Sequence, residues 1–153
     1  MAAKRPAQAR SALDSDGAVV IVCRGGDCGS RRKHPTVDHA TQLAFIRIAV
    51  GDAADVLVSK CLDACEHSNV IVVVPNAHDR DRGVEPVWVG EVNDPDVTDD
   101  LTGWVKSPTL WSTPPPTLVD IHTFIPTRRS RHELADPDTV PAARGTRHSR
   151  KRR

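Results

Sequence analysis

The residues of this chain with the clearest chemistry are its four cysteines, Cys23, Cys28, Cys61 and Cys65. They form two close pairs with the spacings C-x4-C and C-x3-C, and residues 29–60 separate the two pairs. Both pairs lie in polar stretches, which argues against their being small buried core residues. Four thiols in a cytosolic protein indicate a metal or cluster site in preference to a disulfide framework.

The cysteine spacing leaves three kinds of chemistry open. Zinc sites usually contain C-x2-C or C-x4-C, so the C-x3-C pair is unusual for zinc. Iron–sulfur clusters take four thiolates with more varied spacings. Gly25 and Gly26, between the first two cysteines, let the backbone approach closely and turn N–H groups toward sulfurs. We expect an iron–sulfur cluster, with a structural four-cysteine zinc site as the alternative and a Cys61/Cys65 thiol oxidoreductase as the third reading, although thioredoxin motifs use C-x-x-C.

Two predicted strands position these cysteine pairs. Residues 18–23 are a continuous apolar, β-branched run, which is typical of a strand buried on both faces, and residues 54–59 predict a second strand. A helix capped by Thr36 or Asp38 and ending at Gly51 connects them. Such a crossover makes the strands parallel, so both cysteine pairs are expected at the same edge of the sheet.

The rest of the fold follows from the next apolar runs. Residues 69–75 and 86–92 predict two further strands, joined as a hairpin by the polar loop 76–85. Asn93 or Asp94 caps a last helix. The order β-α-β-β-β-α predicts a small α/β sandwich with a mixed four-stranded sheet.

The chain length of 153 residues favours one domain flanked by irregular ends. We expect a disordered arm at 1–17, the domain at 18–106, and a Pro-rich segment at 107–126, in which 118–125 runs extended along the body. Residues 127–153 are arginine-rich with few large apolar side chains, and we expect a basic disordered tail there.

The net charge of +1 conceals an acidic body between two basic ends. Residues 1–10 carry +3 and residues 127–153 carry +6, which leaves −8 for residues 11–126. An acidic body favours docking to a basic redox partner. The basic tail lacks aromatic residues that could stack on bases, so a nucleic-acid function is disfavoured.

The lengths of the apolar runs and the motifs of the sequence bear on cellular location and on enzyme activity. The longest apolar runs, 18–23 and 70–74, fall far below the roughly 18 residues of a membrane span. The basic first ten residues are followed by polar 11–17 and not by an apolar signal core. We therefore expect a soluble cytoplasmic protein. It is not expected to be an enzyme, because no phosphate-binding loop or nucleophile–base arrangement is visible.

Two other groups of polar residues have simpler interpretations. His67 lies two residues after Cys65, and we interpret it as a surface loop histidine, because four cysteines already complete a cluster. The aspartates between positions 94 and 100 open the last helix, where carboxylates favour the positive end of the helix dipole. Capping is preferred there over a docking patch.

These motifs together resemble the thioredoxin-like [2Fe-2S] ferredoxins and the related small [2Fe-2S] subunit of respiratory complex I. The resemblance covers residues 18–106 and rests on the strand run ending in V-I-V-C, on the C-L-D-A-C-E unit, on the V-I-V-V-V-P strand and on V-W-V-G. It implies a thioredoxin-like fold and one [2Fe-2S] cluster per chain, bound by Cys23, Cys28, Cys61 and Cys65. It also implies one-electron transfer between redox partner proteins (a reductase or an oxidoreductase), a homodimer, and no small-molecule substrate.

The chain departs from the family pattern in three places. Many members have C-L-G-x-C, whereas Asp63 stands at the glycine position here. An aspartate beside an anionic cluster makes reduction harder unless it points to solvent. The hairpin loop 76–85 is longer than expected, and the basic tail is not part of the family pattern. None of these differences removes a ligand.

Overall fold

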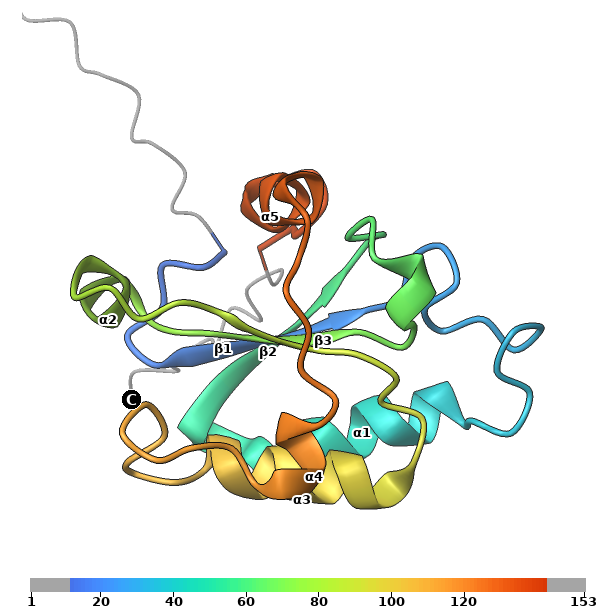
Figure 1. The fold of residues 1–153 in the computed structure, drawn as a ribbon, viewed down its shortest axis with the longest axis horizontal. Coiled ribbons are helices and arrows are strands. Elements are labelled where there is room, and N and C mark those ends of the chain that lie inside the picture. The colour runs from blue at the N-terminus through green and yellow to red at the C-terminus, as the bar shows by residue number, and fades with distance from the viewer. Residues whose placement is uncertain (1–11, 143–153) are drawn as a thin grey trace, which may run out of the picture.

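The framework of the computed structural model, which describes residues 12–142, is a four-stranded mixed sheet (Figure 1). The strands are β1 (Ala18–Cys23), β2 (Ala54–Ser59), β3 (Ile71–Val74) and β4 (Val87–Val89), in the order β2-β1-β3-β4. β1 pairs with β2 in parallel, and β3 is antiparallel to both β1 and β4. The predicted mixed sheet, with one crossover and one hairpin, is therefore confirmed.

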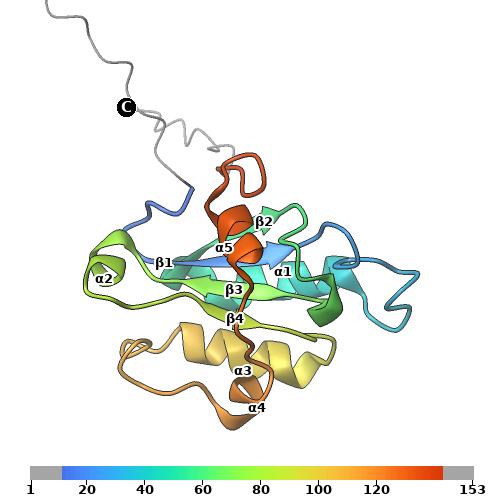
Figure 2. The same cartoon turned by 45° about the horizontal axis from the view of Figure 1, so that its top comes forward.

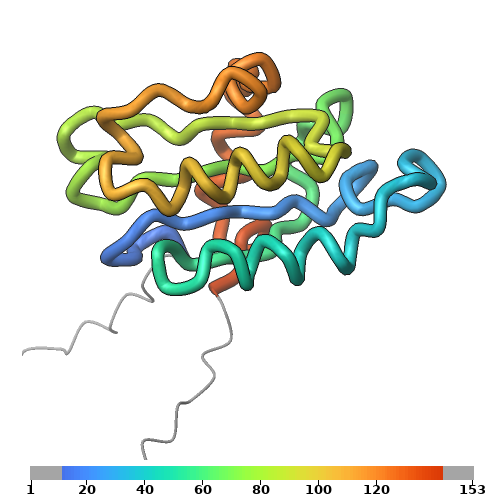
Figure 3. Tube along the Cα trace, turned by 90° about the horizontal axis from the view of Figure 1, so that it is seen from below, coloured from blue at the N-terminus to red at the C-terminus, as the bar shows by residue number. Residues whose placement is uncertain are grey.

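Helices cover both faces of this sheet. On one face, α1 (His39–Val50) and α3 (Pro95–Val105) lie side by side, with the short helix α4 (Thr117–Asp120) next to α3 (Figures 1 and 3). On the other face lies α5 (Arg128–Ala135), as Figure 2 shows. A further short helix, α2 (Ala77–Asp81), forms within the loop between β3 and β4. The sheet is thus the middle layer.

The ends of α1 and α3 are set by local side-chain chemistry. The Asp38 carboxylate accepts a hydrogen bond of 3.0 Å from the Thr41 N–H, so Asp38 is the cap of α1. Gly51 follows α1 with a positive φ of 53°, a conformation that favours glycine, and opens a one-turn 3-10 helix (Gly51–Ala53). The Asp94 carboxylate caps α3 by accepting from the Asp96 N–H at 2.8 Å. Both helices begin where the sequence predicted.

The side chains of β1 alternate between two separate cores. Val20 and Val22 pack with α1 and α3, whereas Val19, Ile21 and Cys23 face the side that α5 covers. All six residues of β1 are buried, as predicted for a strand covered on both faces. Complete burial of an aliphatic side chain of this kind stabilises the fold by about 1.5–3 kcal/mol.

The N-terminal arm is shorter than predicted. Residues 1–11 lie outside the described residues, but residues 12–17 are part of the domain. Leu13 is buried in the core on the α5 face, and the Ser15 hydroxyl donates a hydrogen bond of 2.7 Å to Asp55. The prediction of disorder is therefore wrong for 12–17, because a single leucine finds an apolar site on the sheet.

The Pro-rich segment 107–126 is only partly extended. It contains α4, which begins directly after Pro116. The extended part follows it, where the Phe124 N–H donates to the Trp88 carbonyl at 3.0 Å and Thr123 bridges Val89 in antiparallel fashion. The chain thus crosses beside β4 from one face of the sheet to the other.

The largest correction concerns residues 127–153, predicted to be a disordered basic tail. Residues 128–135 form α5, which Thr127 caps by accepting a hydrogen bond from the Ser130 N–H at 3.0 Å. Leu134 and Val140 are both buried in the core on that face of the sheet. The few apolar residues of this segment are therefore placed where they cover the sheet. Residues 143–153 lie outside the described part of the chain.

No helix among residues 12–142 is long and apolar enough to cross a membrane.

Candidate metal centre

Two loops at the carboxyl ends of β1 and β2 carry the four cysteines. Cys23 is the last residue of β1, and its Cα partner in the parallel register is Ser59, the last residue of β2. Cys28 follows Cys23 in the loop, and Cys61 lies just beyond Ser59. Cys65 opens a one-turn 3-10 helix (Cys65–His67). The crossover thus brings both cysteine loops to one edge of the sheet, as the sequence predicted.

The four thiols are arranged as two pairs. The Cys61 and Cys65 sulfurs lie 3.5 Å apart. The Cys23 thiol donates to the Lys60 carbonyl at 3.4 Å, and Cys23 and Cys28 shift each other's pKa. All four cysteines are free. Cys23 and Cys28 are buried, with 1% and 3% of their surface exposed, whereas Cys61 and Cys65 are partly exposed. One pair therefore lies in the core and the other at the surface.

Two glycines let the first loop lie directly against the second pair. Gly26 has a positive φ of 60°, and a Cβ at this position would lie 2.7 Å from the Cys65 sulfur and 3.1 Å from the Cys61 sulfur. A Cβ at Gly25 would overlap the backbone nitrogen of Cys61. Only glycine fits at these two positions. The close approach of the loop backbone, predicted from the Gly-Gly pair, is confirmed.

Backbone N–H groups point at the sulfurs. The Val70 N–H donates to the Cys28 sulfur at 3.4 Å, and the Asp63 N–H donates to the Cys61 sulfur at 3.4 Å. Such donors stabilise negative charge on a sulfur and tune a bound metal group. Asp63 lies within the second cysteine loop, and Val70 follows that loop in the chain.

The cysteine pKa values follow from this geometry. The hydrogen bond from Cys28 and backbone hydrogen bonds from Gly25 and Leu62 lower the pKa of Cys23 to about 6, although burial opposes the shift. The pKa of Cys28 is raised, because its thiol is the donor to Cys23 and because it is buried. Burial also raises the pKa of Cys61. The pKa values of the two buried thiols are therefore shifted in opposite directions.

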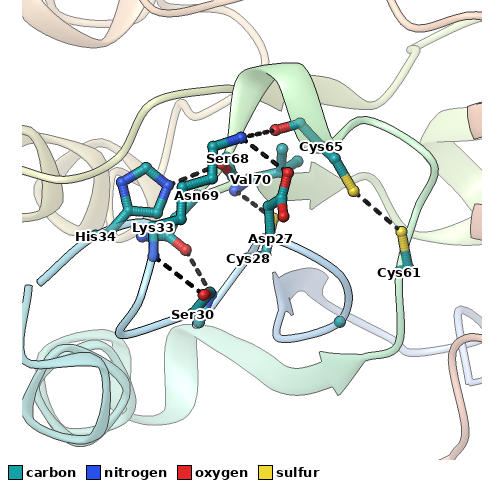
Figure 4. A network of polar contacts seen from close by, with 12 residues as sticks. Asp27, Cys28, Ser30, Lys33, His34, Cys61, Cys65, Ser68, Asn69 and Val70 are labelled. Atoms are coloured by element: carbon teal, nitrogen blue, oxygen red, sulfur yellow. Dashed lines mark hydrogen bonds and ion pairs between the residues drawn. The ribbon is translucent and has the colours of Figure 1, made fainter.

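Lys33 ties the two cysteine loops together. Its ammonium group donates to the Asp27 carboxylate at 2.8 Å in the first loop and to the Cys65 carbonyl at 3.1 Å in the second (Figure 4). The hydrogen bond to Asp27 raises the pKa of Lys33, so its side chain stays charged. A positive charge therefore stands beside the exposed cysteine pair. Its role was not predicted, because the sequence places it five residues beyond the first pair.

Asn69 is a second positioning residue that sequence reasoning missed. It is fully buried, its amide oxygen accepts from the Gly29 N–H at 2.6 Å, and its amide nitrogen contacts Asn93 at 2.7 Å and the His39 ring at 3.1 Å. These contacts join the first cysteine loop to α1 and to the start of α3. A polar residue directly before an apolar strand was the only signal in the sequence.

The C-terminal segment holds the second cysteine loop from outside. The Ser130 hydroxyl donates to the Asp63 carbonyl at 3.0 Å, and the Lys60 N–H donates to the Thr139 carbonyl at 2.9 Å. Asp63 has a positive φ of 56°, a backbone conformation that favours glycine. Its carboxylate is 55% exposed and pairs with Arg129 at 3.5 Å, so its charge points to solvent.

The other polar residues singled out in the sequence lie as follows. His67 is partly exposed, and its ring stacks on Phe124 with a centroid distance of 3.9 Å. Gly90 makes room for it, because a Cβ there would lie 2.9 Å from the His67 Cβ. Asp94 caps α3, and Asp96 and Asp99 line an open groove of about 540 Å³ between α1 and α3. Capping is thus confirmed for Asp94.

The arrangement of the four sulfurs bears on which metal group they could hold. Within residues 12–142, no three His, Cys, Asp or Glu side chains converge on a point that could hold one metal ion. The sulfurs lie instead as two pairs. A [2Fe-2S] cluster takes two protein ligands at each of its two irons. The four free cysteines fit such a group, because they form two pairs with N–H donors around them and with Gly25 and Gly26 packed against the second pair (the glycine cradle).

Comparison with family models, with curated proteins and with solved structures finds no match in any of the three. The resemblance to thioredoxin-like [2Fe-2S] ferredoxins therefore stays a prediction.

Proposed function

We propose that this protein is a one-electron carrier that holds one [2Fe-2S] cluster per chain on Cys23, Cys28, Cys61 and Cys65. The observation that carries the proposal is the meeting of the two cysteine loops, with Gly26 packed so tightly on the second pair that a Cβ would lie 2.7 Å from a sulfur. If the cysteines only filled space in the core, the close packing of Gly25 and Gly26 against the second cysteine loop would not be required. We also propose that the fold is thioredoxin-like and that the protein works in the cytoplasm.

The chain's own residues would each do part of this work. When bound, a [2Fe-2S] cluster accepts and releases one electron at a time. Thiolates hold the irons, and the Val70 and Asp63 N–H groups donate to the sulfurs of Cys28 and Cys61. Burial excludes water from the Cys23 and Cys28 side.

The partners that we propose are redox proteins, a donor and an acceptor, and not a small-molecule substrate. They would approach at Cys61 and Cys65, because these thiols are partly exposed while the other pair is buried. The acidic groove lined by Asp96 and Asp99 would favour a basic partner surface. A homodimer is part of the same proposal and rests on the family resemblance.

The test is the metal content of protein purified without oxygen from iron-replete cells. We expect a red-brown protein with about two iron and two acid-labile sulfide per chain. Replacement of each cysteine in turn by serine should lower both contents, whereas Ser112→Ala, an exposed serine outside the two cysteine loops, should not. A colourless protein with one zinc and no sulfide would contradict the proposal in favour of the four-cysteine zinc module.

A thiol oxidoreductase is the second candidate, because the Cys61 and Cys65 sulfurs lie only 3.5 Å apart. Two thiols at this distance can form a disulfide by releasing two electrons and two protons to an oxidised partner thiol pair. Metal-free protein that reduces a disulfide substrate through Cys61, and that keeps this activity in Cys28→Ser, would favour this candidate. Protein that is inactive in this assay and binds iron and sulfide would exclude it.

A further inference from the structure

Ser59 has a buried hydroxyl group that no contact in the described chain accounts for. It is the last residue of β2, and only 3% of its surface is exposed. Among residues 12–142, its Oγ has no hydrogen-bond partner. Buried polar groups in proteins are nearly always hydrogen-bonded, so an unpaired hydroxyl needs an explanation.

The strand register places this hydroxyl beside a cysteine. Ser59 and Cys23 are Cα partners in the parallel pairing of β1 and β2. Alternate residues of a strand point to the same face, and Leu57, two positions before Ser59, lies in the same core as Cys23. The side chains of Ser59 and Cys23 therefore point to the same side of the sheet from neighbouring strands.

Both residues are shielded from solvent. Cys23 has 1% and Ser59 3% of its surface exposed, so bulk water does not reach the Ser59 hydroxyl beside the Cys23 side chain.

We propose that the Ser59 hydroxyl donates a hydrogen bond to the Cys23 sulfur when that sulfur is a cluster ligand, and that it thereby raises the reduction potential. This rests on the electron-carrier function proposed above. An electron taken from a redox partner protein increases the negative charge on the ligand sulfurs, so a donor stabilises the reduced state more than the oxidised state. The site is buried, and a hydrogen bond is stronger there than in water.

Ser59 differs from the other donors at the site. Val70 and Asp63 donate through backbone N–H groups, which a side-chain substitution leaves in place. The contribution of Ser59 depends on its residue type. It is therefore a positioning and tuning residue that holds no metal itself.

The test compares three variants. Ser59→Ala removes the hydroxyl, Ser59→Thr keeps it, and Ser68→Ala is the matched control. Ser68 is also a serine with 3% exposure, but its hydroxyl bonds to the His34 ring at 2.8 Å and to no sulfur. The measurements are iron and sulfide content, the reduction potential, and the urea midpoint of the metal-free protein.

For Ser59→Ala we expect full iron and sulfide content and a more negative potential. At a fixed ambient potential, the ratio of reduced to oxidised protein should fall about tenfold, which corresponds to about 59 mV for one electron. Ser59→Thr and Ser68→Ala should keep the potential of the unmodified protein. In the metal-free state the order reverses: Ser59→Ala should be at least as stable as the unmodified protein, because an unpaired hydroxyl is lost, whereas Ser68→Ala should be less stable.

Three results would overturn the proposal. One is an unchanged potential in Ser59→Ala. Another is an equal shift in Ser59→Thr, which would show that the hydroxyl is not responsible. The third is loss of the cluster in Ser59→Ala alone, which would assign the hydroxyl to assembly and not to tuning. Unmodified protein without iron and sulfide would instead refute the electron-carrier function itself.

Discussion

Replacing Leu134 by alanine tests whether the C-terminal helix belongs to the fold. Leu134 is buried, with 6% of its surface exposed, in the same core as Leu13 and Val140. It is the only buried apolar side chain of α5, whose eight residues are too few to be helical in isolation. We therefore expect Leu134→Ala to release α5 from the sheet.

The expected cost is large compared with the stability of a domain. A Leu→Ala change at a buried site costs about 2–5 kcal/mol, while the whole free energy of unfolding of a domain is about 5–15 kcal/mol. Release of α5 also breaks the hydrogen bond from the Ser130 hydroxyl to the Asp63 carbonyl. That bond holds the second cysteine loop, so the proposed cluster should be lost faster as well.

The assay is urea unfolding of the metal-free protein, followed by the rate at which holo protein loses its visible absorption. His132→Ala is the matched control, because His132 lies on the same helix and is exposed; it should change stability by less than about 0.5 kcal/mol. Two shortened chains extend the test. A chain ending at Ala142 should behave like the full chain, and one ending at Pro126 should behave like Leu134→Ala or worse. If Leu134→Ala were as stable as His132→Ala, the packing of α5 on the sheet would be wrong.

Two further predictions concern the glycine cradle and the buried histidine. Gly26→Ala should bind little or no iron and should destabilise the metal-free protein by about 1–2 kcal/mol, because Gly26 has a positive φ. The control is Gly103→Ala, on α3 with open space around it, which should stabilise the protein by about 0.5–1 kcal/mol. Normal iron content in Gly26→Ala would contradict the proposed role of Gly26 at the cysteines. Burial lowers the pKa of His39. His39 therefore binds a proton more readily in the unfolded chain than in the folded chain. The free energy of unfolding of the metal-free protein should decrease as pH falls below about 6.5, the ordinary histidine pKa. His39→Gln, which keeps an acceptor for Asn69 without titrating, should flatten this pH dependence, whereas exposed His132→Gln should not; an unchanged slope in His39→Gln would contradict the assignment.

The sequence alone determined the parts of the fold that depend on local patterns. Residues 18–23 and 54–59 form strands with those bounds, because short runs rich in valine, isoleucine and leucine between polar loops have few other local solutions. Asp38 and Asp94 were recognisable as caps, since capping involves only the next three residues. The helical crossover between β1 and β2 then predicted that these two strands are parallel neighbours.

The candidate ligands could be found in the same way, because cysteine is rare and its spacing is informative. Gly25 and Gly26 were recognisable from their position between two cysteines. Ser59 and Asn69 were not, because a serine or an asparagine has no distinctive chemistry until its neighbours are known. Their importance depends on the strand register, which places Ser59 opposite Cys23, and on the loop that brings Gly29 to Asn69.

Only the tertiary structure showed that residues 12–17 and 127–142 are packed against the sheet. Around Leu134 the sequence is arginine-rich and carries too few apolar residues to predict a packed helix. The reason that Leu13, Leu134 and Val140 are buried lies elsewhere in the chain: α1 and α3 cover one face of the sheet and leave the other apolar face to be covered. Three isolated side chains from both ends of the described chain meet on that face, and no local pattern records a contact between residues more than a hundred positions apart.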